Sequence, residues 1–255
     1  MSSAALHDTR LLTARSLRHI LRSPDTIITT AITPIAMMLL FVFVFGGAIN
    51  TGSSESYVDY MLPGILIITI ASGVAYTSYR LFLDMSEGMM LRLRSLPISR
   101  SSILWGHVLT SLAANAISLL LVIGVAFLAG FRAQASVLDW LAVAALLLAT
   151  TLALTWVAVI AGLSAKTVDG ASAFSYPLIL LPFISSAFVP TDSMPKAVAW
   201  FAEHQPITAI VDSLRSLLTG SGVDASIWVS AAWLLGLLAA AWGLSLYVFA
   251  RKTRG

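Results

Sequence analysis

The amino-acid sequence predicts an all-α integral membrane protein with six transmembrane helices. The chain of 255 residues is 58% hydrophobic and only 11% charged, and its mean hydropathy is +0.90. So few polar residues cannot cover the surface of a soluble domain. Six stretches are apolar over about 20 residues, the length that crosses a bilayer. Basic residues concentrate on alternate connections between these stretches, as expected for repeated crossings.

The six predicted spans are not equally regular. They lie near residues 27–48, 60–79, 103–129, 140–163, 171–190 and 227–249. Proline interrupts helical hydrogen bonding, so Pro177 and Pro182 predict a kinked or broken fifth span, and Pro34 predicts a kink in the first. We expect the first span to stay in the mature protein, because its uncharged run from 26 to 54 exceeds a signal-peptide core. A cleaved signal is the alternative.

The distribution of charge predicts the orientation of the chain. Of the 15 Lys and Arg residues, twelve fall in the leader, the second loop, the fourth loop and the C-terminal tail, leaving Arg132, Lys196 and Arg215 for the opposite side. The positive-inside rule therefore places both termini in the cytoplasm, as an even number of crossings requires. The acidic residues on the outer side are interpreted as solvated loops. The excess of Arg over Lys is typical of a GC-rich bacterial genome, so we expect a bacterial cytoplasmic membrane.

Residues 1–24 precede the first span, and the spacing of their apolar and basic residues predicts an amphipathic helix at the membrane interface. With a rotation of about 100° per residue, Leu17 and Leu21 fall on one side of this helix, and Arg15, Arg18 and Arg22 fall on the other. The apolar side would lie among lipid headgroups, and the arginines would meet lipid phosphate or an acidic partner protein. The alternative is that these arginines only set the topology.

Several kinds of chemistry are disfavoured because their motifs are missing. The Lys-Thr pairs at 166–167 and 252–253 are not preceded by glycine, so the chain has no P-loop for ATP. Without cysteine or a His-Glu-x-x-His motif, neither a thiolate site nor a zinc site is expected. Gly162-Leu-Ser-Ala165 lacks the second glycine of a serine-hydrolase motif. We therefore predict no enzymatic activity, no bound metal and no nucleic-acid partner.

The spans also lack the charges that ion-coupled carriers usually bury along the ion path. None has Asp, Glu, Lys or Arg at its centre. His107 is the one titratable exception, and its place near the cytoplasmic start of the third span predicts a hydrogen-bonded or interfacial side chain without a functional role. A secondary multidrug carrier is therefore a less favoured alternative, and a non-transporting membrane scaffold is a third.

The connection between the second and third spans, residues 84–100, is the most informative segment. Met85, Met89 and Leu93 recur every four residues and predict a short amphipathic helix. Methionine adapts to a partner's groove, and the arginines of this segment could pair with acidic residues there. The pattern favours a cytoplasmic docking surface, although a solvated loop that only fixes topology fits the charges equally well.

Motifs in and around this segment resemble a known family. Before the second span the chain reads Tyr57-Val-Asp-Tyr-Met-Leu-Pro-Gly64, and after it come Asp84, Glu87-Gly88 and Arg92-Leu-Arg-Ser-Leu-Pro-Ile-Ser-Arg100. Further matching pieces are Arg22-Ser-Pro-Asp25, Phe45-Gly-Gly-Ala-Ile49 and the run from Phe188-Val-Pro190 to Pro195. In this order and spacing, they resemble the membrane subunits of type-2 ABC exporters, particularly the daunorubicin/doxorubicin-resistance permease branch.

This resemblance implies that the leader helix and the loop after the second span contact a separate ATP-binding subunit, with a coupling helix in the loop. The implied coupling residues are Glu87, Gly88, Arg92, Arg94, Pro97 and Arg100, and the implied interface-helix residues are Arg15, Arg18 and Arg22. It also implies two ATPase subunits per transporter and a second permease chain, giving a homodimer or a heterodimer. ATP and Mg would bind to the ATPase, so no cofactor is expected on this chain.

The resemblance further implies two short re-entrant helices within residues 190–220, on the extracytoplasmic side before the last span. Trp200, Phe201 and Ile207 would supply apolar anchors, and Gln205-Pro206 would form the break between the helices. The alternative is a plain amphipathic outer loop. Together with the leader helix and the coupling segment, these helices would complete a single transmembrane domain over residues 1–255.

The predicted function is ATP-driven export of an amphipathic or hydrophobic compound, such as a drug, an antibiotic or a lipid-like molecule. Apolar spans without buried ions suit such solutes better than small inorganic ions. Candidate pathway residues are Met37, Phe41, Tyr76, Phe174, Tyr176 and Phe183, for which plain packing or contact with lipid is the alternative. An ABC exporter of lipid or polysaccharide is the alternative within the same family.

Overall fold

The computed structural model describes residues 24–46, 56–86 and 100–254, and these residues form helices joined by turns and loops. Strands are absent from this described part of the chain. The predicted leader helix with Arg15, Arg18 and Arg22 lies outside the described residues. So do five predicted coupling residues, Glu87, Gly88, Arg92, Arg94 and Pro97.

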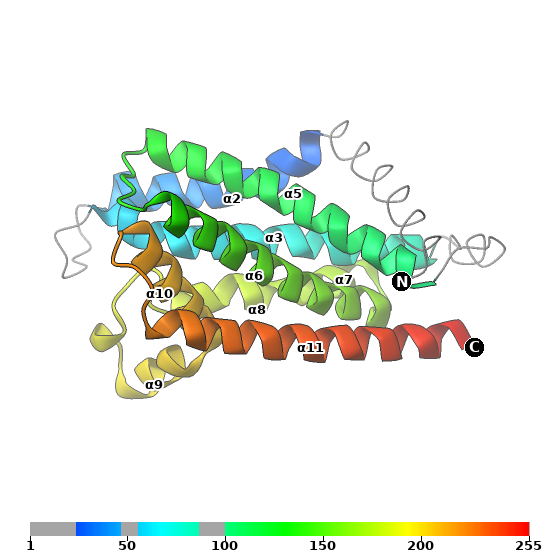
Figure 1. Ribbon diagram of the computed structural model, residues 1–255. Coiled ribbons are helices and arrows are strands. Elements are labelled where there is room, and N and C mark those ends of the chain that lie inside the picture. Colours follow the sequence, from blue (N-terminus) through cyan, green and yellow to red (C-terminus); the bar gives the residue numbers. More distant parts are fainter. Residues whose placement is uncertain (1–23, 47–55, 87–99, 255) are drawn as a thin grey trace.

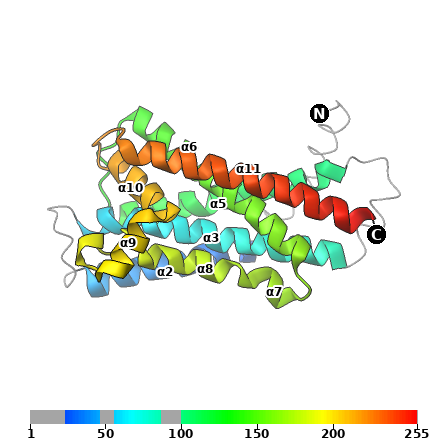
Figure 2. The same ribbon diagram turned by 90° about the horizontal axis from the view of Figure 1, so that it is seen from below.

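Five long helical segments lie side by side and run along a common direction (Figures 1 and 2). They are α2 (Pro24–Leu40), which continues into the π-helical turn η1 (Phe41–Phe45), α3 (Tyr57–Ser86), α5 (Arg100–Leu128), α6 (Val137–Ser164) and α11 (Ala225–Arg254). From α2 to α6 successive segments run in opposite directions, and α11 runs the same way as α6 after the intervening short helices, so the C-terminus and the end of α3 share one end of the bundle (Figure 1). Alternating direction is what repeated membrane crossings require.

Four described helices are long and apolar enough to cross a membrane: α3, α5 from Leu104, α6, and α11 as far as Arg251. The other two predicted spans, 27–48 and 171–190, correspond to shorter apolar helices, Thr30–Phe45 and Val168–Ile184. The chain is therefore a helical protein with several candidate membrane spans.

The second long helix extends beyond its predicted span. The apolar run suggested an end near residue 79, but α3 continues through Arg80 and Asp84 to Ser86. Helical hydrogen bonding needs no apolar side chains, and charged groups near a span end can reach toward the interface. Asp84 and Met85 consequently belong to α3, so their assignment to a separate amphipathic segment is wrong.

The fifth predicted span is interrupted, as its prolines indicate. It consists of α7 (Val168–Ala173), α8 (Ser175–Leu180) and the 3₁₀ turn η2 (Leu181–Ile184). Thr167 caps α7 by accepting a hydrogen bond from the Gly170 amide. Pro182 stands at the start of η2, where its missing amide hydrogen costs little. By contrast, α2 continues through Pro34.

Two short helices precede α11 and lie at the end of the bundle opposite the C-terminus (Figure 1). After the 3₁₀ turn η3 (Thr191–Ser193) come α9 (Lys196–His204) and α10 (Pro206–Leu218). Gln205 separates them with an extended backbone, and Pro206 begins α10. The predicted break at Gln205-Pro206 is therefore present. One face of α10, including Ile210, Val211 and Leu214, is buried against the bundle.

Helix α3 forms the centre of the bundle and contacts α2, α5, α6, α7, α8 and α10. Its most apolar 18-residue window is 78% buried, whereas that of α11 is only 17% buried. Close approach to α3 depends partly on glycine. A Cβ placed on Gly162 of α6 would lie 2.7 Å from the Ser78 carbonyl oxygen of α3, so the two backbones are nearly in contact.

We therefore expect Gly162→Ala to destabilise the fold. The methyl group must push α6 away from α3, which costs about 1–3 kcal/mol in an overpacked core. Gly124→Ala is the matched control, because a Cβ there meets nothing within 4 Å. Unfolding in mixed micelles would measure both variants. Equal stability of the two would contradict the close α3–α6 contact.

Candidate functional site

The structure brings together two of the predicted pathway residues, Phe41 and Phe183, in an aromatic cluster. The ring of Phe188 stacks on both, with centroid distances of 5.2 Å to Phe41 and 4.9 Å to Phe183. Phe41 also lies 5.5 Å from Phe45. The cluster joins the end of the first helical segment to the end of the broken fifth span. Phe183 is partly open to the surroundings, with 38% of its surface exposed.

The other predicted pathway residues lie elsewhere. Met37 and Phe174 are partly buried and pack against the main hydrophobic core. Tyr76 lies on α3. The centre of its ring is 6.1 Å from the centre of the Tyr79 ring and 5.9 Å from the guanidinium carbon of Arg80. Tyr176 is 65% exposed on α8. None of these four residues has a ring contact with Phe41, Phe183 or Phe188 among the aromatic contacts of the described residues.

The predicted coupling segment is flanked by a contact that sequence reasoning missed. Arg100, the last predicted coupling residue, begins α5. Seven residues further along α5, His107 Nε2 lies 3.1 Å from Asp84 Oδ2 near the end of α3. This contact joins the end of α3 to the first part of α5, on either side of the segment that connects the two helices. Sequence analysis assigned His107 no role, because the partner of a histidine on another helix cannot be read from local spacing.

A chain of buried hydroxyl groups links three candidate spans. Thr77 of α3 donates to Ser111 of α5 at 2.9 Å, and Ser111 lies 3.0 Å from the Thr155 hydroxyl of α6. Asn115, one turn beyond Ser111, donates to the Ser111 carbonyl at 3.0 Å. Hydrogen bonds between spans help helices to associate where water cannot compete. The three helices are thus joined at mid-bundle by polar contacts, although none of these groups is charged.

An arginine-centred network joins α10, α3 and the segment after η2 at the end opposite the His107 pair. Arg215 donates to the carbonyl of Ser186 at 2.6 Å, to that of Tyr60 at 3.2 Å and to Asp212 Oδ1 at 2.8 Å. Its guanidinium carbon lies 4.0 Å from the centre of the Tyr60 ring. Asp212 Oδ1 also accepts a hydrogen bond from the Ser186 hydroxyl at 2.6 Å.

This network corrects the interpretation of Asp212 as a solvated outer carboxylate and gives Arg215, which the sequence only placed on the outer side, its partners in the bundle. The side chain of Arg215 is only 17% exposed. Arg215 and Asp212 lie one helical turn apart on α10, so one face of this helix carries a charged pair that meets its partners in the bundle. The spacing was visible in the sequence, but the partners Tyr60 and Ser186 come from distant parts of the chain.

Neither network resembles a catalytic or metal centre. Within the described ranges, no group of three or more His, Cys, Asp or Glu side chains could hold a metal ion. These polar contacts join neighbouring helices to one another, in the middle of the bundle and at its end, so their role is structural linkage.

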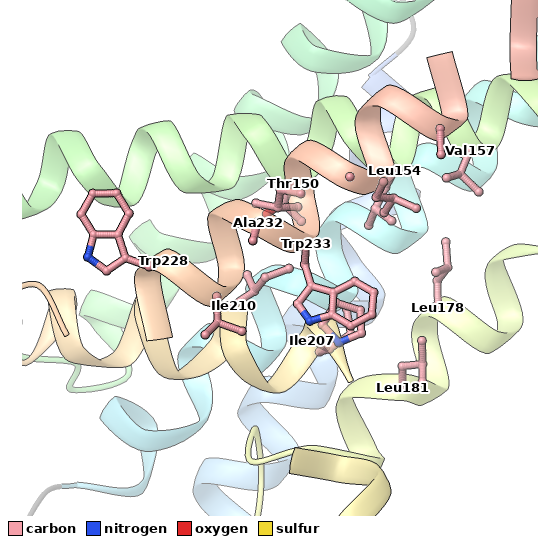
Figure 3. A pocket seen from close by; sticks show the side chains of 16 residues that line it. Thr150, Leu154, Val157, Leu178, Leu181, Ile207, Ile210, Trp228, Ala232 and Trp233 are labelled. Carbon is pink, nitrogen blue, oxygen red and sulfur yellow. The ribbon is translucent and has the colours of Figure 1, made fainter. Parts of the chain in front are cut away.

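A separate apolar cavity of about 900 Å³ lies between α6, α10, α11 and the α8–η2 segment (Figure 3). Its walls include Leu154, Leu181, Ile207, Trp228 and Trp233. None of the six predicted pathway residues lines it. Sequence patterns could not identify it, because its lining comes from four separated parts of the chain.

We expect Arg215→Met to destabilise the end of the bundle that contains α10. The Ser186 carbonyl and the Asp212 carboxylate would lose a charged donor, at a cost of about 1–3 kcal/mol. Arg215→Lys should recover part of this loss, because lysine keeps the charge but not the forked guanidinium. Lys196→Met, which removes an exposed cation on α9, is the control. The unfolding temperatures of the variants would be measured in detergent. Equal values for Arg215→Met and Lys196→Met would contradict a stabilising role of the network.

A double-mutant cycle tests the contact between Asp84 and His107. We expect the single changes Asp84→Ala and His107→Ala to be non-additive by at least about 0.5 kcal/mol, as for other contacting pairs. The control cycle combines Asp84→Ala with His204→Ala, since His204 lies on α9 at the opposite end of the bundle (Figure 1). Additive unfolding free energies in the first cycle would show that the pair contributes nothing.

Comparison with known proteins gives consistent matches. The profile of the ABC-2 type transporter family matches residues 7–219. Daunorubicin resistance ABC transporter permease protein DrrB1 from Streptomyces coeruleorubidus is 26% identical over 202 residues, covering 78% of this chain and 70% of that protein. A probable doxorubicin resistance ABC transporter permease protein, DrrC from Mycobacterium tuberculosis, is 25% identical over 232 residues, covering 90% and 83%.

The matched region extends from the leader through every described helix as far as α10, and therefore includes the aromatic cluster, the Asp84–His107 pair and the Arg215 network. This coverage confirms the resemblance derived from the sequence motifs. With its several apolar helices and a family match over most of its length, the chain belongs to the ABC-2 type transporter family of multi-pass membrane proteins.

Proposed function

We propose that this chain is the membrane-spanning permease subunit of an ATP-driven exporter, powered by a separate ATPase subunit. The family match over residues 7–219 is the observation that carries the proposal. The names of its relatives, permeases for daunorubicin and doxorubicin resistance, favour an amphipathic or hydrophobic substrate such as a drug, an antibiotic or a lipid-like molecule. The chain itself carries no P-loop, so ATP and Mg would bind to the partner.

The proposed topology has six crossings in a bacterial cytoplasmic membrane. These are α2–η1, α3, α5, α6, the broken α7–α8–η2 segment and α11, and their alternating directions support this assignment (Figures 1 and 2). The connection between α6 and α7 carries Lys166, and α11 ends at Arg254, so the positive-inside rule puts this end in the cytoplasm. α9 and α10 would then lie on the outer side as the re-entrant pair.

Energy would enter through the segment between α3 and α5. Its arginines, Arg92, Arg94 and Arg100, suit an acidic groove on the ATPase. Asp84 and His107 connect the two flanking helices. A movement of the ATPase that displaces this segment would therefore move α3 and α5 together. α3 contacts most other helices, so its movement would reach the rest of the bundle.

The exported compound would move along a surface shared with a second permease chain. The partly exposed aromatic cluster of Phe41 and Phe183 is the best-supported part of this surface, because aromatic faces suit flat amphipathic solutes. Met37, Tyr76, Phe174 and Tyr176 are weaker candidates. A copy of this chain and a related permease both fit as the second chain.

Charge reversal in the coupling segment tests the proposal. We expect Arg92→Glu/Arg94→Glu to lower ATP-driven export by at least about tenfold, since each repulsive contact with an acidic groove costs several kcal/mol. The chain and the P-loop ATPase that we expect the adjacent reading frame to encode would be reconstituted together in vesicles. Uptake of doxorubicin into inverted vesicles would then be measured with and without ATP.

Lys196→Glu reverses a charge on the opposite side and is the matched control. Normal export by the double variant would reject the role of the two arginines in docking. Transport by the purified chain without any ATPase would favour a secondary carrier and would overturn the proposed function itself.

A further inference from the structure

The apolar cavity beside α11 has no place in the proposed export pathway, and its geometry suggests a different ligand. Its lining is contributed by α6, α10, α11 and the α8–η2 segment. Trp233 projects from α11 over Ile207 of α10, and Leu178 and Leu181 face them from the broken span (Figure 3). The cavity opens on the outer surface of the bundle, because Trp233 is 46% exposed and Trp228 is 72% exposed.

The mostly apolar side chains that line the cavity favour a hydrocarbon ligand. No charged side chain lines the cavity. Thr150 contributes the only hydroxyl among the lining residues, and this hydroxyl already donates to the Leu146 carbonyl at 2.8 Å. The indole N–H groups of Trp228 and Trp233, residues that are 72% and 46% exposed, are the other polar side-chain groups of the lining. A ligand with polar groups away from these two donors would leave those groups without hydrogen bonds, at a considerable cost in free energy. An occupant made only of methylene groups incurs no such cost.

The position of the cavity along α11 favours one particular hydrocarbon. It follows α11 from Trp228, three residues after the helix begins, to Ala240. With a rise of 1.5 Å per residue, this stretch is about 18 Å long. One leaflet occupies about 15 Å of a hydrocarbon core about 30 Å thick. The cavity therefore starts near the membrane surface and reaches about as deep as one leaflet.

We propose that this cavity binds one acyl chain of a membrane lipid. The headgroup would remain level with Trp228, whose indole suits the boundary between polar and apolar regions. The chain would descend between α11 and the α6 wall, along the small and exposed residues Ala232, Gly236 and Ala240. Such binding requires only that α6 and α11 cross the bilayer, so it does not depend on ATP-driven export.

Two glycines of α11 provide a matched pair of variants. A Cβ added at Gly236 or at Gly243 meets nothing within 4 Å, and both residues are exposed. They are seven residues apart, which places them on similar faces of the helix. Only Gly236 lines the cavity. Gly236→Leu should therefore obstruct it, whereas Gly243→Leu makes the same chemical change outside it.

The experiment uses the full chain in nanodiscs of phosphatidylethanolamine and phosphatidylglycerol. A trace of phosphatidylcholine with a diazirine on its acyl chain is photoactivated, and the labelled peptides are identified by mass spectrometry. We expect preferential labelling within residues 206–210 and 228–240. Gly236→Leu should reduce it at least about fivefold, because the acyl chain loses buried methylenes. Gly243→Leu should leave it unchanged.

Three outcomes would overturn the proposal. The first is equal labelling around Leu120 and Leu121, an exposed part of α5 away from the cavity, which would indicate only the general lipid shell. The second is equal labelling of the two glycine variants. The third is loss of labelling on addition of excess doxorubicin, which would make the cavity a drug site. Ala232→Phe provides a second obstruction at a lining residue and decides the matter if Gly236→Leu fails to fold.

Discussion

Helix α3 packs closely against six other helices, and this packing sets the arrangement of the whole bundle. In lipid, apolar side chains do not drive helices together as they do in water, so association relies on close backbone approach and interhelical hydrogen bonds. Both occur here. A Cβ on Gly64 would lie 2.6 Å from the Ala187 side chain, and Gly162 meets the backbone of Ser78. The Ser78 hydroxyl donates to the Ala171 carbonyl at 2.6 Å and so ties the broken span to α3.

Polar contacts connect α3 to its neighbours at three levels along its length. The Asp84–His107 pair lies near the end of α3 that precedes the predicted coupling segment. The hydroxyl chain through Ser111 lies at mid-bundle, and the Arg215 network reaches Tyr60 near the opposite end. A movement of α3 would therefore be shared with α5, α6 and α10. This arrangement would suit the proposed function, in which motion of an attached ATPase is transmitted to the outer side. The outward-facing α11, with its cavity, takes little part in these links.

The sequence predicted well what depends on local composition. The all-helical character and the interruption of the fifth span by Pro177 and Pro182 follow from hydrophobicity and from the missing amide hydrogen of proline. The break at Gln205-Pro206 was implied by the family resemblance. Family membership followed from motifs at defined spacing. The sequence did not predict the extension of α3 to Ser86, because helical hydrogen bonding continues past the apolar run. It also interpreted Asp212 as a solvated carboxylate, whereas Asp212 accepts hydrogen bonds from Ser186 and Arg215.

The amino-acid sequence was enough to identify a multi-pass helical membrane protein, the connections that carry its basic residues, and its family. These properties depend on residue type and on order along the chain. The contacts of His107 with Asp84 and of Arg215 with Ser186 became visible only in three dimensions, as did the apolar cavity between four separated segments. Such contacts depend on how helices are rotated and spaced against one another. Periodicity within a single helix does not specify either.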